Sequence, residues 1–593
     1  MKARYYIYLS AIAMMGLTSC SDSFLDHNPD ERVDIDNETK VVQLLNSAYP
    51  DCNPSWLGEI YSDNLIDNMA PHIPSNPNDK EVLAHYNYSQ FSLEDNQSFR
   101  FEPATQATYS TYDSPGQLWG GYYNSIAYCN FALDAIKQLE AKDSLSESLR
   151  AARGEAELLR AYDHFMLVSY FSSAYRGEAS KQDIGVPYVT ETENVVNKQY
   201  DRGNVYDTYQ KIQRDLEAGL ADISDLNYTT APKYHFNVNA ANAFAARFYL
   251  FKHDYEKVIE YADKVLGTDS ATTQRMTMDY SVFAGCASGD DYSTAWQNPS
   301  LNNNLLLIPT GSLLTRRVLG YRYSCAGPAA RQVYMMHSDL PLKSGYICPV
   351  QALVGGMTFS SSSSDYGFFS SKIYEKFQYT NKIAGIGFPH VIYRAFTGSE
   401  LLLERAEAKI MLGRYDDAAN DLMAYWNDGL NSFTAADKAA YIATGYGRYL
   451  TKAMILNYYG THNDDNTAIL DDWSCAQKMG INIPAEAKPY MNCLNDFRRF
   501  ENMFEGMRLL DIKRWGLTVT HEVGLESTPY TAKALSPKLN IEVPWESIQA
   551  GMQSSRDSNG VVVTGATSEE RAKVSPLTEN FTFDRAKFVT KSK

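Results

Sequence analysis

The sequence lacks the short motifs that mark most enzyme active sites. The patterns H-E-x-x-H, G-x-S-x-G, S-x-x-K and G-x-x-x-x-G-K-[ST] do not occur, and Gly385-Ile386-Gly387 lacks the third glycine of a dinucleotide-binding loop. Glycoside hydrolysis needs only two carboxylates about 5 to 9 Å apart, and 71 acidic residues can supply such a pair without a motif. We therefore expect no enzyme, while a hydrolase stays an open alternative.

The sequence also lacks the residue patterns of metal-binding sites. Seven of the eight cysteines follow Cys20, but they form no C-x-x-C pair and no histidine lies at zinc-site spacing from them. Because structural zinc sites need such clusters, we expect neither a metal nor a cofactor. An odd number of cysteines also leaves at least one free thiol unless it pairs between chains.

Basic residues are fewer than acidic residues in this chain. The chain has 54 lysines and arginines against 71 acidic residues, so its net charge is −17. Such a chain is repelled by nucleic acids and anionic surfaces. After Leu17 no apolar run approaches the about 18 residues that a membrane-spanning helix needs. With 44% hydrophobic composition in 593 residues, the bulk of the chain is expected to fold in water around a large core.

The first 20 residues have the pattern of a secretory leader with a lipidation site. Lys2 and Arg4 precede the apolar run Tyr5 to Leu17, which is too short to span a bilayer. Leu17-Thr18-Ser19-Cys20 suits the lipoprotein peptidase, which cuts before a cysteine that carries diacylglycerol. We expect residues 1–19 to be removed and Cys20 to carry lipid, since two or three acyl chains attach durably. A plain secreted protein with an incidental Cys20 is the alternative.

Apolar spacing predicts a mainly α-helical body over residues 38–593, joined to Cys20 by an acidic tether over residues 20–37. A short helix is expected from Asn37. Long helices are expected from Leu118 to Leu139 and from Leu145 to Ser169, so the first helical unit covers residues 118–170. The alanines of the second helix allow another helix to approach closely.

Two later segments have the pattern of helix-turn-helix units. Residues 240–266 and 400–426 each contain two helices around a short turn, and an aromatic residue, Tyr255 or Tyr415, opens the second helix. This resembles the tetratricopeptide pattern of about 34 residues per unit. The two tyrosines lie 160 residues apart in the sequence, so the units must meet in space across long insertions.

The insertions are the loop-rich part of the chain. Residues 52–117 and 268–390 are rich in Ser, Asn, Pro, Gly and aromatic residues. Loops this long inside a compact domain usually bind something or contain small elements of their own. We expect one large irregular subdomain on the helical scaffold, with short strands near Leu305 to Ile308.

Residues 497–516 carry the most specific pattern of the C-terminal half. The segment Phe497-Arg498-Arg499-Phe500-Glu501-Asn502-Met503-Phe504-Glu505-Gly506-Met507-Arg508-Leu509-Leu510-Asp511-Ile512-Lys513-Arg514-Trp515-Gly516 resembles the signature helix of the SusD/RagB family of outer-membrane nutrient-binding lipoproteins. The i to i+3 spacing predicts that Glu505 pairs with Arg508 and Asp511 with Arg514. Gly516 is placed to end the helix. We expect a structural role for this segment and no ligand contact.

The resemblance continues in family order along most of the chain. The similar segments are Ser21 to Asp26, Ala152 to Tyr170, Glu404 to Ala408 and Val543 to Ile548. Met507 and Leu509-Leu510 depart from the usual His and Trp-Phe, and Gly551-Met552 stands where Asn-Pro is common, which bears on the subfamily. The resemblance implies four tetratricopeptide-like units and a variable loop region that holds the binding face.

The resemblance also implies a function and a partner. It indicates a cell-surface glycan-binding lipoprotein, anchored in the outer membrane and facing the exterior, that captures oligosaccharides. Its partner would be a SusC-like TonB-dependent outer-membrane barrel, to which the ligand is passed. RagB-like members instead handle peptides, so a peptide ligand is an alternative, and a surface glycoside hydrolase is a third hypothesis.

A sugar site needs aromatic platforms beside groups that hydrogen-bond to hydroxyls. Tyrosine is abundant here, with 43 copies against 35 glycines, although packing is the commoner role of any single tyrosine. The loops offer these candidate ligand-binding residues: Trp296, Tyr292, Tyr321, Tyr323, Trp56, Asp63 and Asn64. Trp296 is the strongest because polar loop residues flank it on both sides. A buried Trp296 that fixes the loop is the alternative, and Asp63 and Asn64 are alternatively turn residues.

Overall fold

The computed structural model describes residues 35–67, 92–193, 198–283, 285–318, 322–326, 358–359, 367–368, 371–432, 435, 439, 449–461, 472–524 and 526–556. Cys20, the predicted leader and most of the predicted tether lie outside these residues. Six cysteines lie within them, and all six are free thiols. No helix of the described residues is both long enough and apolar enough to cross a bilayer.

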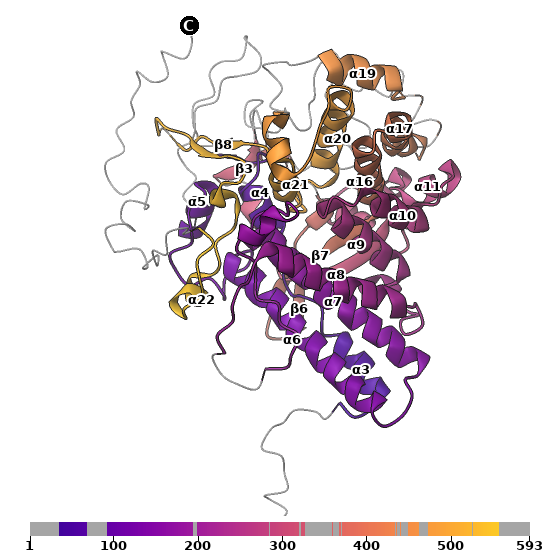
Figure 1. Ribbon diagram of the computed structural model, residues 1–593, viewed down its shortest axis with the longest axis vertical. Helices are drawn as coiled ribbons and strands as arrows, with labels where there is room; N and C mark the ends of the chain where they lie inside the picture. The colour runs from indigo at the N-terminus through magenta and orange to yellow at the C-terminus, as the bar shows by residue number, and fades with distance from the viewer. Residues whose placement is uncertain are drawn as a thin grey trace, which may run out of the picture.

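Helices make up most of the described structure, as the sequence predicted. In chain order they are α3 (Glu38–Leu45), α4 (Ser55–Ile60), α5 (Leu93–Phe99), α6 (Pro115–Glu140), α7 (Glu147–Phe171), α8 (Val205–Asp222), α9 (Val238–Phe251), α10 (Tyr255–Leu266), α11 (Ser270–Met276), α12 (Gly289–Trp296), α13 (Leu314–Val318), α16 (Gly398–Met411), α17 (Tyr415–Asn431), α19 (Lys452–Thr461), α20 (Lys488–Glu501), α21 (Arg508–Trp515) and α22 (Trp545–Gln549). Figure 1 shows α3 and α6–α8 in the lower part of the molecule and α16, α17 and α20 in the upper part.

Polar side chains fix where the first helices begin. The side chains of Asn37, Ser114 and Ser146 each accept a hydrogen bond from the backbone N–H three residues later, at the starts of α3, α6 and α7. Such caps satisfy backbone donors that the helix leaves unpaired. The predicted helices from Asn37, from Leu118 and from Leu145 are confirmed by α3, α6 and α7.

The long helix α7 lies between α6 and α8. Its alanines Ala152, Ala156 and Ala161 are fully buried. Small residues also set the approach of α8, because a Cβ on Gly154 would lie 2.6 Å from the backbone nitrogen of Ile223. The close approach that the alanine pattern predicted is therefore present.

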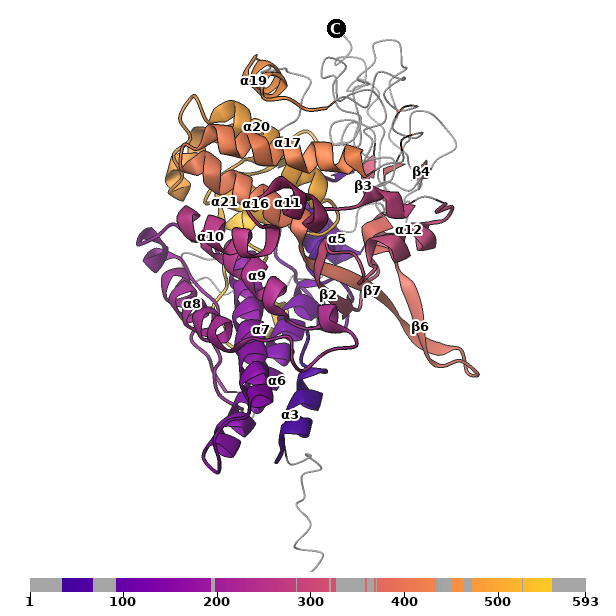
Figure 2. The ribbon, with the colours of Figure 1, turned by 90° about the vertical axis from the view of Figure 1, so that its right-hand side faces the viewer.

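The two separated helix-turn-helix units meet in space. The first is α9 with α10, the second is α16 with α17, and α16 packs against both α9 and α10. Figure 2 shows α16, α17 and α20 stacked above α9 and α10. The prediction that units 160 residues apart in the sequence come together is confirmed.

The described strands form three small antiparallel sheets. The first has the order β1-β3-β5-β4, the second β2-β7-β6 and the third β8-β9. The strands are β1 (Ile66–Asp67), β2 (Asn304–Thr310), β3 (Tyr323–Ala326), β4 (Thr358–Phe359), β5 (Gly367–Phe368), β6 (Lys376–Asn381), β7 (Ile386–Thr397), β8 (Val519–His521) and β9 (Tyr530–Ala532). The strand expected near Leu305 to Ile308 is β2.

Both predicted loop-rich insertions contribute to one sheet. Strand β1 comes from the first insertion and pairs with β3 from the second, with Ile66 opposite Ser324. Short helices complete these segments, among them α4, α5, α12 and α13. The two insertions are therefore joined, as a single irregular subdomain requires.

The predicted single helix over residues 497–516 is wrong. The segment forms the end of α20 and the whole of α21, and the residues between them turn. Phe504 and Gly506 have φ values of 59° and 82°, a left-handed conformation that a helix cannot contain. The predicted end at Gly516 is confirmed, because Gly516 is left-handed and caps α21.

Candidate ligand-binding site

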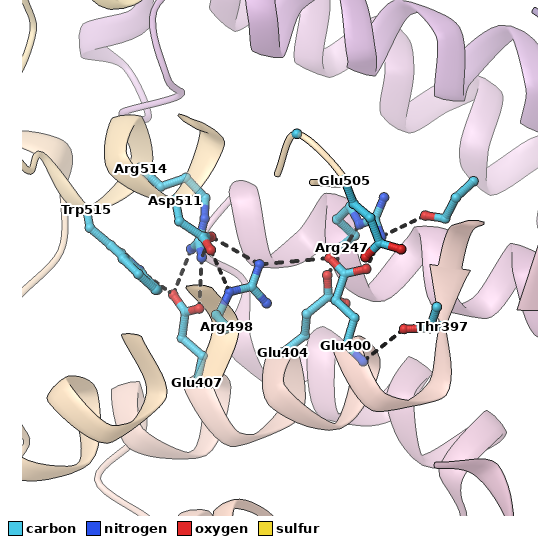
Figure 3. A network of polar contacts seen from close by, with 12 residues as sticks. Arg247, Thr397, Glu400, Glu404, Glu407, Arg498, Glu505, Asp511, Arg514 and Trp515 are labelled. Carbon is cyan, nitrogen blue, oxygen red and sulfur yellow. Dashed lines mark hydrogen bonds and ion pairs between the residues drawn. The ribbon is translucent and has the colours of Figure 1, made fainter. Parts of the chain in front are cut away.

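The segment that resembles a family signature lies against α16 through buried charges (Figure 3). Arg514 donates two hydrogen bonds to Glu407, at 2.7 and 2.9 Å, and one to Asp511 at 2.8 Å. Arg498 of α20 donates to both oxygens of Asp511, at 2.9 and 3.0 Å. Trp515 Nε1 donates to Glu407 at 2.9 Å. Two segments far apart in the sequence are thus held together by side chains that water barely reaches.

Of the two predicted charge pairs in this segment, one is confirmed and one is wrong. Asp511 pairs with Arg514. Glu505 lies in the turn before α21, so it does not reach Arg508 and pairs with Arg394 of β7 at 2.6 Å. Arg508 pairs instead with Asp63, at 2.7 Å. The i to i+3 spacing failed for Glu505 because it is not part of the helix.

Burial and charge oppose each other within this network. Burial acts to raise the pKa of Asp511, but the guanidinium groups of Arg498 and Arg514 outweigh it and hold the pKa below its ordinary value. Glu404 of α16 is the opposite case, since burial and the neighbouring Glu400 raise the pKa of its carboxyl. The network depends on its arginines to keep Asp511 ionised in a dry environment.

Asp63 and Asn64, two of the predicted binding residues, connect the first insertion to this segment. Asp63 accepts hydrogen bonds from Arg508 at 2.7 and 2.9 Å, and the charges of Arg499 and Arg508 overcome its burial and lower its pKa. Asn64 is fully buried and accepts a hydrogen bond from Arg499 at 2.8 Å. Both side chains are engaged within the protein, and a ligand contact for them stays a prediction.

Trp56 and Tyr323 are also placed in the interior. Trp56 is 2% exposed, and its Nε1 donates to Asp95 at 2.8 Å. Tyr323 is 3% exposed, stacks on Phe99 with ring centroids 4.4 Å apart and hydrogen-bonds to Asn96. Tyr321 lies outside the described residues. A stacking role for these rings stays a prediction.

Trp296, the strongest candidate from the sequence, ends α12 with its ring fully buried. The guanidinium of Arg394 lies 4.7 Å from its ring centre, and the ring of Phe283 lies 4.8 Å away. Arg394 is the partner of Glu505, so the Trp296 ring packs against a residue of the buried charge network. Tyr292, one turn earlier, is half-buried and stacks on Phe283. A ligand contact for Trp296 or Tyr292 stays a prediction.

A cavity of about 660 Å³ opens beside α12. Its polar lining comes from α12 and the turn after it, from the base of β6, and from the segment before α9: Tyr234, Asp291, Thr294, Gln297, Asn298 and Lys376. These groups comprise a phenol, a carboxylate, a hydroxyl, two amides and an ammonium, so the lining offers both hydrogen-bond donors and acceptors. The volume lies in the range of small-ligand sites.

The cavity's polar groups are held in position by the protein itself. Lys376 Nζ donates to the Thr294 hydroxyl at 3.0 Å and lies 3.3 Å from Asp290. Gln297 donates to the backbone carbonyl of Lys372 at 3.1 Å. A hydrogen bond from the Ser288 hydroxyl lowers the pKa of Asp291, so this carboxylate is ionised at neutral pH. The described residues contain no group of three or more His, Cys, Asp and Glu that could hold a metal ion.

The sequence identified the segment around Trp296 but not every residue that lines the cavity. It singled out Trp296 for the polar loop residues on both sides of it, and of these Asp291, Gln297 and Asn298 do line the cavity. Tyr234 and Lys376 were missed because they come from distant segments and carry no local signal. The ring of Trp296 is buried in the protein, and the polar residues beside it in the sequence line the cavity.

Glu59 of α4 is a buried carboxyl next to the predicted site residues. It is fully buried and accepts a hydrogen bond from the Asn64 amide at 2.7 Å. Burial raises the pKa of Glu59 from 4.5 to about 7. As pH rises from 4.5 to 7, the unfolded chain releases this proton and the folded chain keeps it, so the folded state loses about 3 kcal/mol.

Replacing Glu59 with glutamine is expected to raise the melting temperature at pH 8 and to leave it nearly unchanged below pH 4, where the carboxyl is protonated in both states, because the amide never ionises. Calorimetry of both proteins across this pH range measures the effect. Glu260→Gln is the control, since Glu260 is exposed and pairs with Lys264 on the same helix. Parallel curves for wild type and Glu59→Gln would show that the Glu59 carboxyl does not govern stability.

Comparisons with known proteins agree with this architecture. Residues 23–250 match the model of a SusD-like family described as starch-binding and associating with the outer membrane. No curated protein matches the sequence.

Solved structures match over much more of the chain. A SusD superfamily protein from Bacteroides thetaiotaomicron has a TM-score of 0.55 and 14% identity, over 88% of this chain and 100% of its own. One from Bacteroides fragilis has a TM-score of 0.54 and 15% identity, over 86% and 97%. A candidate sugar-binding protein from Bacteroides vulgatus has a TM-score of 0.54 and 16% identity, over 89% and 100%. At these identities the likeness shows that this chain shares the fold of these proteins.

Proposed function

We propose that this chain is a member of the SusD/RagB family, that it binds glycans without chemical turnover, and that the cavity beside α12 receives part of the sugar chain. The cavity itself is the observation that carries the proposal. Its lining offers both hydrogen-bond donors and acceptors, and sugar hydroxyls act as both. The family description, starch-binding, and the name of the Bacteroides vulgatus relative favour the same ligand class.

The composition of the cavity favours binding over hydrolysis. Glycoside hydrolysis uses two carboxylates on either side of the scissile bond. Of the described residues that line the cavity, Asp291 alone is a carboxylate. Asp291 also has a structural role, because its Oδ2 caps α12 by accepting hydrogen bonds from the backbone N–H groups of Ser288 and Ala287. Asp291 is therefore proposed to orient hydroxyls and not to carry chemistry.

We further infer that the protein acts at the cell surface. The leader and Cys20 favour a lipid anchor in the outer membrane, with the body facing the exterior. The family description, associating with outer membrane, agrees with this placement. A SusC-like TonB-dependent barrel is the proposed partner that takes over the bound oligosaccharide.

The test of the cavity is a variant that removes its exposed polar groups. Isothermal titration is carried out with oligosaccharides from starch, xylan, mannan and pectin and with a peptide panel. Wild type is expected to bind at least one oligosaccharide. Thr294→Val combined with Lys376→Met removes a hydroxyl and an ammonium and should weaken that binding about tenfold or more, since each lost hydrogen bond costs about 0.5–1.5 kcal/mol.

Lys264→Met is the matched control for the cavity variant. Lys264 is also partly exposed, and it pairs with Glu260 on α10 at 2.9 Å, away from the cavity lining. It should bind like wild type. Tight peptide binding without any glycan binding would contradict the proposal and favour the RagB-like alternative. Release of reducing ends from the bound oligosaccharide would contradict the absence of turnover.

A further inference from the structure

Strands β6 and β7 form an arm that projects from the body (Figure 2). The arm is defined as residues 376–390. Ten large hydrophobic residues are exposed in the described structure, and four of them lie here: Phe377, Tyr379, Ile383 and Ile386. The arm contains Lys376, Lys382 and His390 but no carboxylate, although the whole chain has net charge −17. So much apolar surface on a projecting hairpin indicates a binding surface.

Phe377 and Tyr379 form a fixed aromatic corner on one face of the arm. They are two residues apart on β6 and so point to the same side of the sheet. Their ring centroids lie 4.9 Å apart with planes at 72°, and the side chains are 43% and 52% exposed. About half of each side chain is therefore open to solvent.

Gly387 of β7 holds this corner in place. It lies opposite Tyr379 in the register, and Pro389 lies opposite Phe377. A Cβ at Gly387 would lie 2.7 Å from Phe377 Cε1 and 2.1 Å from the Gln378 carbonyl oxygen. The Phe377 ring therefore lies directly over the glycine, in space that any side chain would fill. A platform held in this way loses little conformational freedom when a ligand stacks on it.

We propose that Phe377 and Tyr379 are a second sugar-binding subsite, which stacks on the apolar faces of pyranose rings of the same polysaccharide that enters the cavity. This inference rests on the proposed function. Flat rings suit the C–H face of a sugar, and Tyr adds a polar rim. The face is uncharged, because strand alternation directs Lys376 and Gln378 to the other side.

The arm is continuous with the cavity at its base. Lys376 of β6 and Ile392 of β7 both line the cavity, and Phe377 follows Lys376 directly. Lys376 and Ile392 lie on the face of the arm opposite the two rings, and β6 is the edge strand of its sheet. A long glycan that passes over this edge can contact the cavity and the aromatic corner at once, while a short one reaches a single site. Two linked contacts raise the affinity for the polymer without any new contact at either site.

The test compares a polymer with a short oligosaccharide. Affinity electrophoresis uses amylopectin, xylan, mannan and pectin, and titration uses a short oligosaccharide of the polysaccharide that wild type retains. Phe377→Leu with Tyr379→Leu keeps apolar bulk but removes the flat rings. This variant is expected to bind the polysaccharide about tenfold more weakly and to bind the short oligosaccharide in the cavity as wild type does.

Ile383→Ser is the matched control, because Ile383 is fully exposed at the tip of the same arm and has no ring. It should retain the polysaccharide fully, and a thermal melt of each variant checks its fold. Unchanged polysaccharide affinity in the Leu variant, with the cavity variant impaired, would overturn the subsite and leave the proposed function standing. Equal losses in the Ile383→Ser and Leu variants would indicate a general apolar contact and also overturn it. Failure of wild type to bind any of the glycans would overturn the proposed function as well.

Discussion

Replacing Arg514 with methionine is expected to lower the free energy of unfolding by about 3–5 kcal/mol. Arg514 is 2% exposed at its side chain and satisfies both oxygens of Glu407 and one of Asp511. Without it, Glu407 keeps only the Trp515 indole N–H among these contacts, and Asp511 keeps Arg498. A carboxylate left buried without its cation carries a large desolvation penalty. Urea denaturation of wild type and variant measures the loss.

Arg414→Met is the control for this loss. Arg414 also makes two contacts with one carboxylate, that of Glu256, at 2.8 and 3.0 Å, but both side chains are largely exposed. An exposed pair contributes about 0–1 kcal/mol. The double variant Arg514→Met with Glu407→Gln should recover part of the loss, since the stranded charge is gone. Equal effects of Arg514→Met and Arg414→Met would show that the buried network does not hold the two segments together.

Replacing Gly506 with alanine is expected to destabilise the protein by more than about 3 kcal/mol or to prevent folding. Gly506 has a φ of 82°, where a Cβ costs about 1–2 kcal/mol. An added Cβ would also lie 2.5 Å from the carbonyl oxygen of Pro54, which precedes α4. The neighbour is backbone, so α4 and the turn before α21 must separate. Thermal melts and soluble yield measure the result.

Gly177→Ala separates the two causes. Gly177 has a φ of 63°, also left-handed, but an added Cβ meets no atom within 4 Å. It should lose only the conformational part, about 1 kcal/mol. If both alanine variants lose the same amount, the close approach of Gly506 to Pro54 contributes nothing to stability.

Local patterns predicted the helices well because their causes are local. The capping side chains of Asn37, Ser114 and Ser146 and the apolar spacing behind them placed α3, α6 and α7. Tyr255 and Tyr415 opened the second helices of both units, and α10 and α17 begin at these residues. The meeting of the two units also followed, because neither unit can bury its apolar face alone.

Long-range pairing limited the prediction of the site. Arg499 meets Asn64, and Arg508 meets Asp63, across more than 400 residues of sequence, and no spacing rule reports such partners. The break at Phe504 and Gly506 was hidden in a segment with helical charge spacing, so Glu505 was assigned to Arg508. The Trp296 ring packs against Arg394 and Phe283, which lie outside α12. The sequence of α12 alone therefore does not determine whether this ring is buried or exposed.

A crystal structure of the protein with the oligosaccharide that binds best tests the central claim most directly. The account predicts sugar density in the cavity beside α12, with hydroxyls within hydrogen-bond distance of Thr294, Asp291 and Lys376. An ordered sugar bound elsewhere on the surface, with the cavity left to solvent, would contradict it.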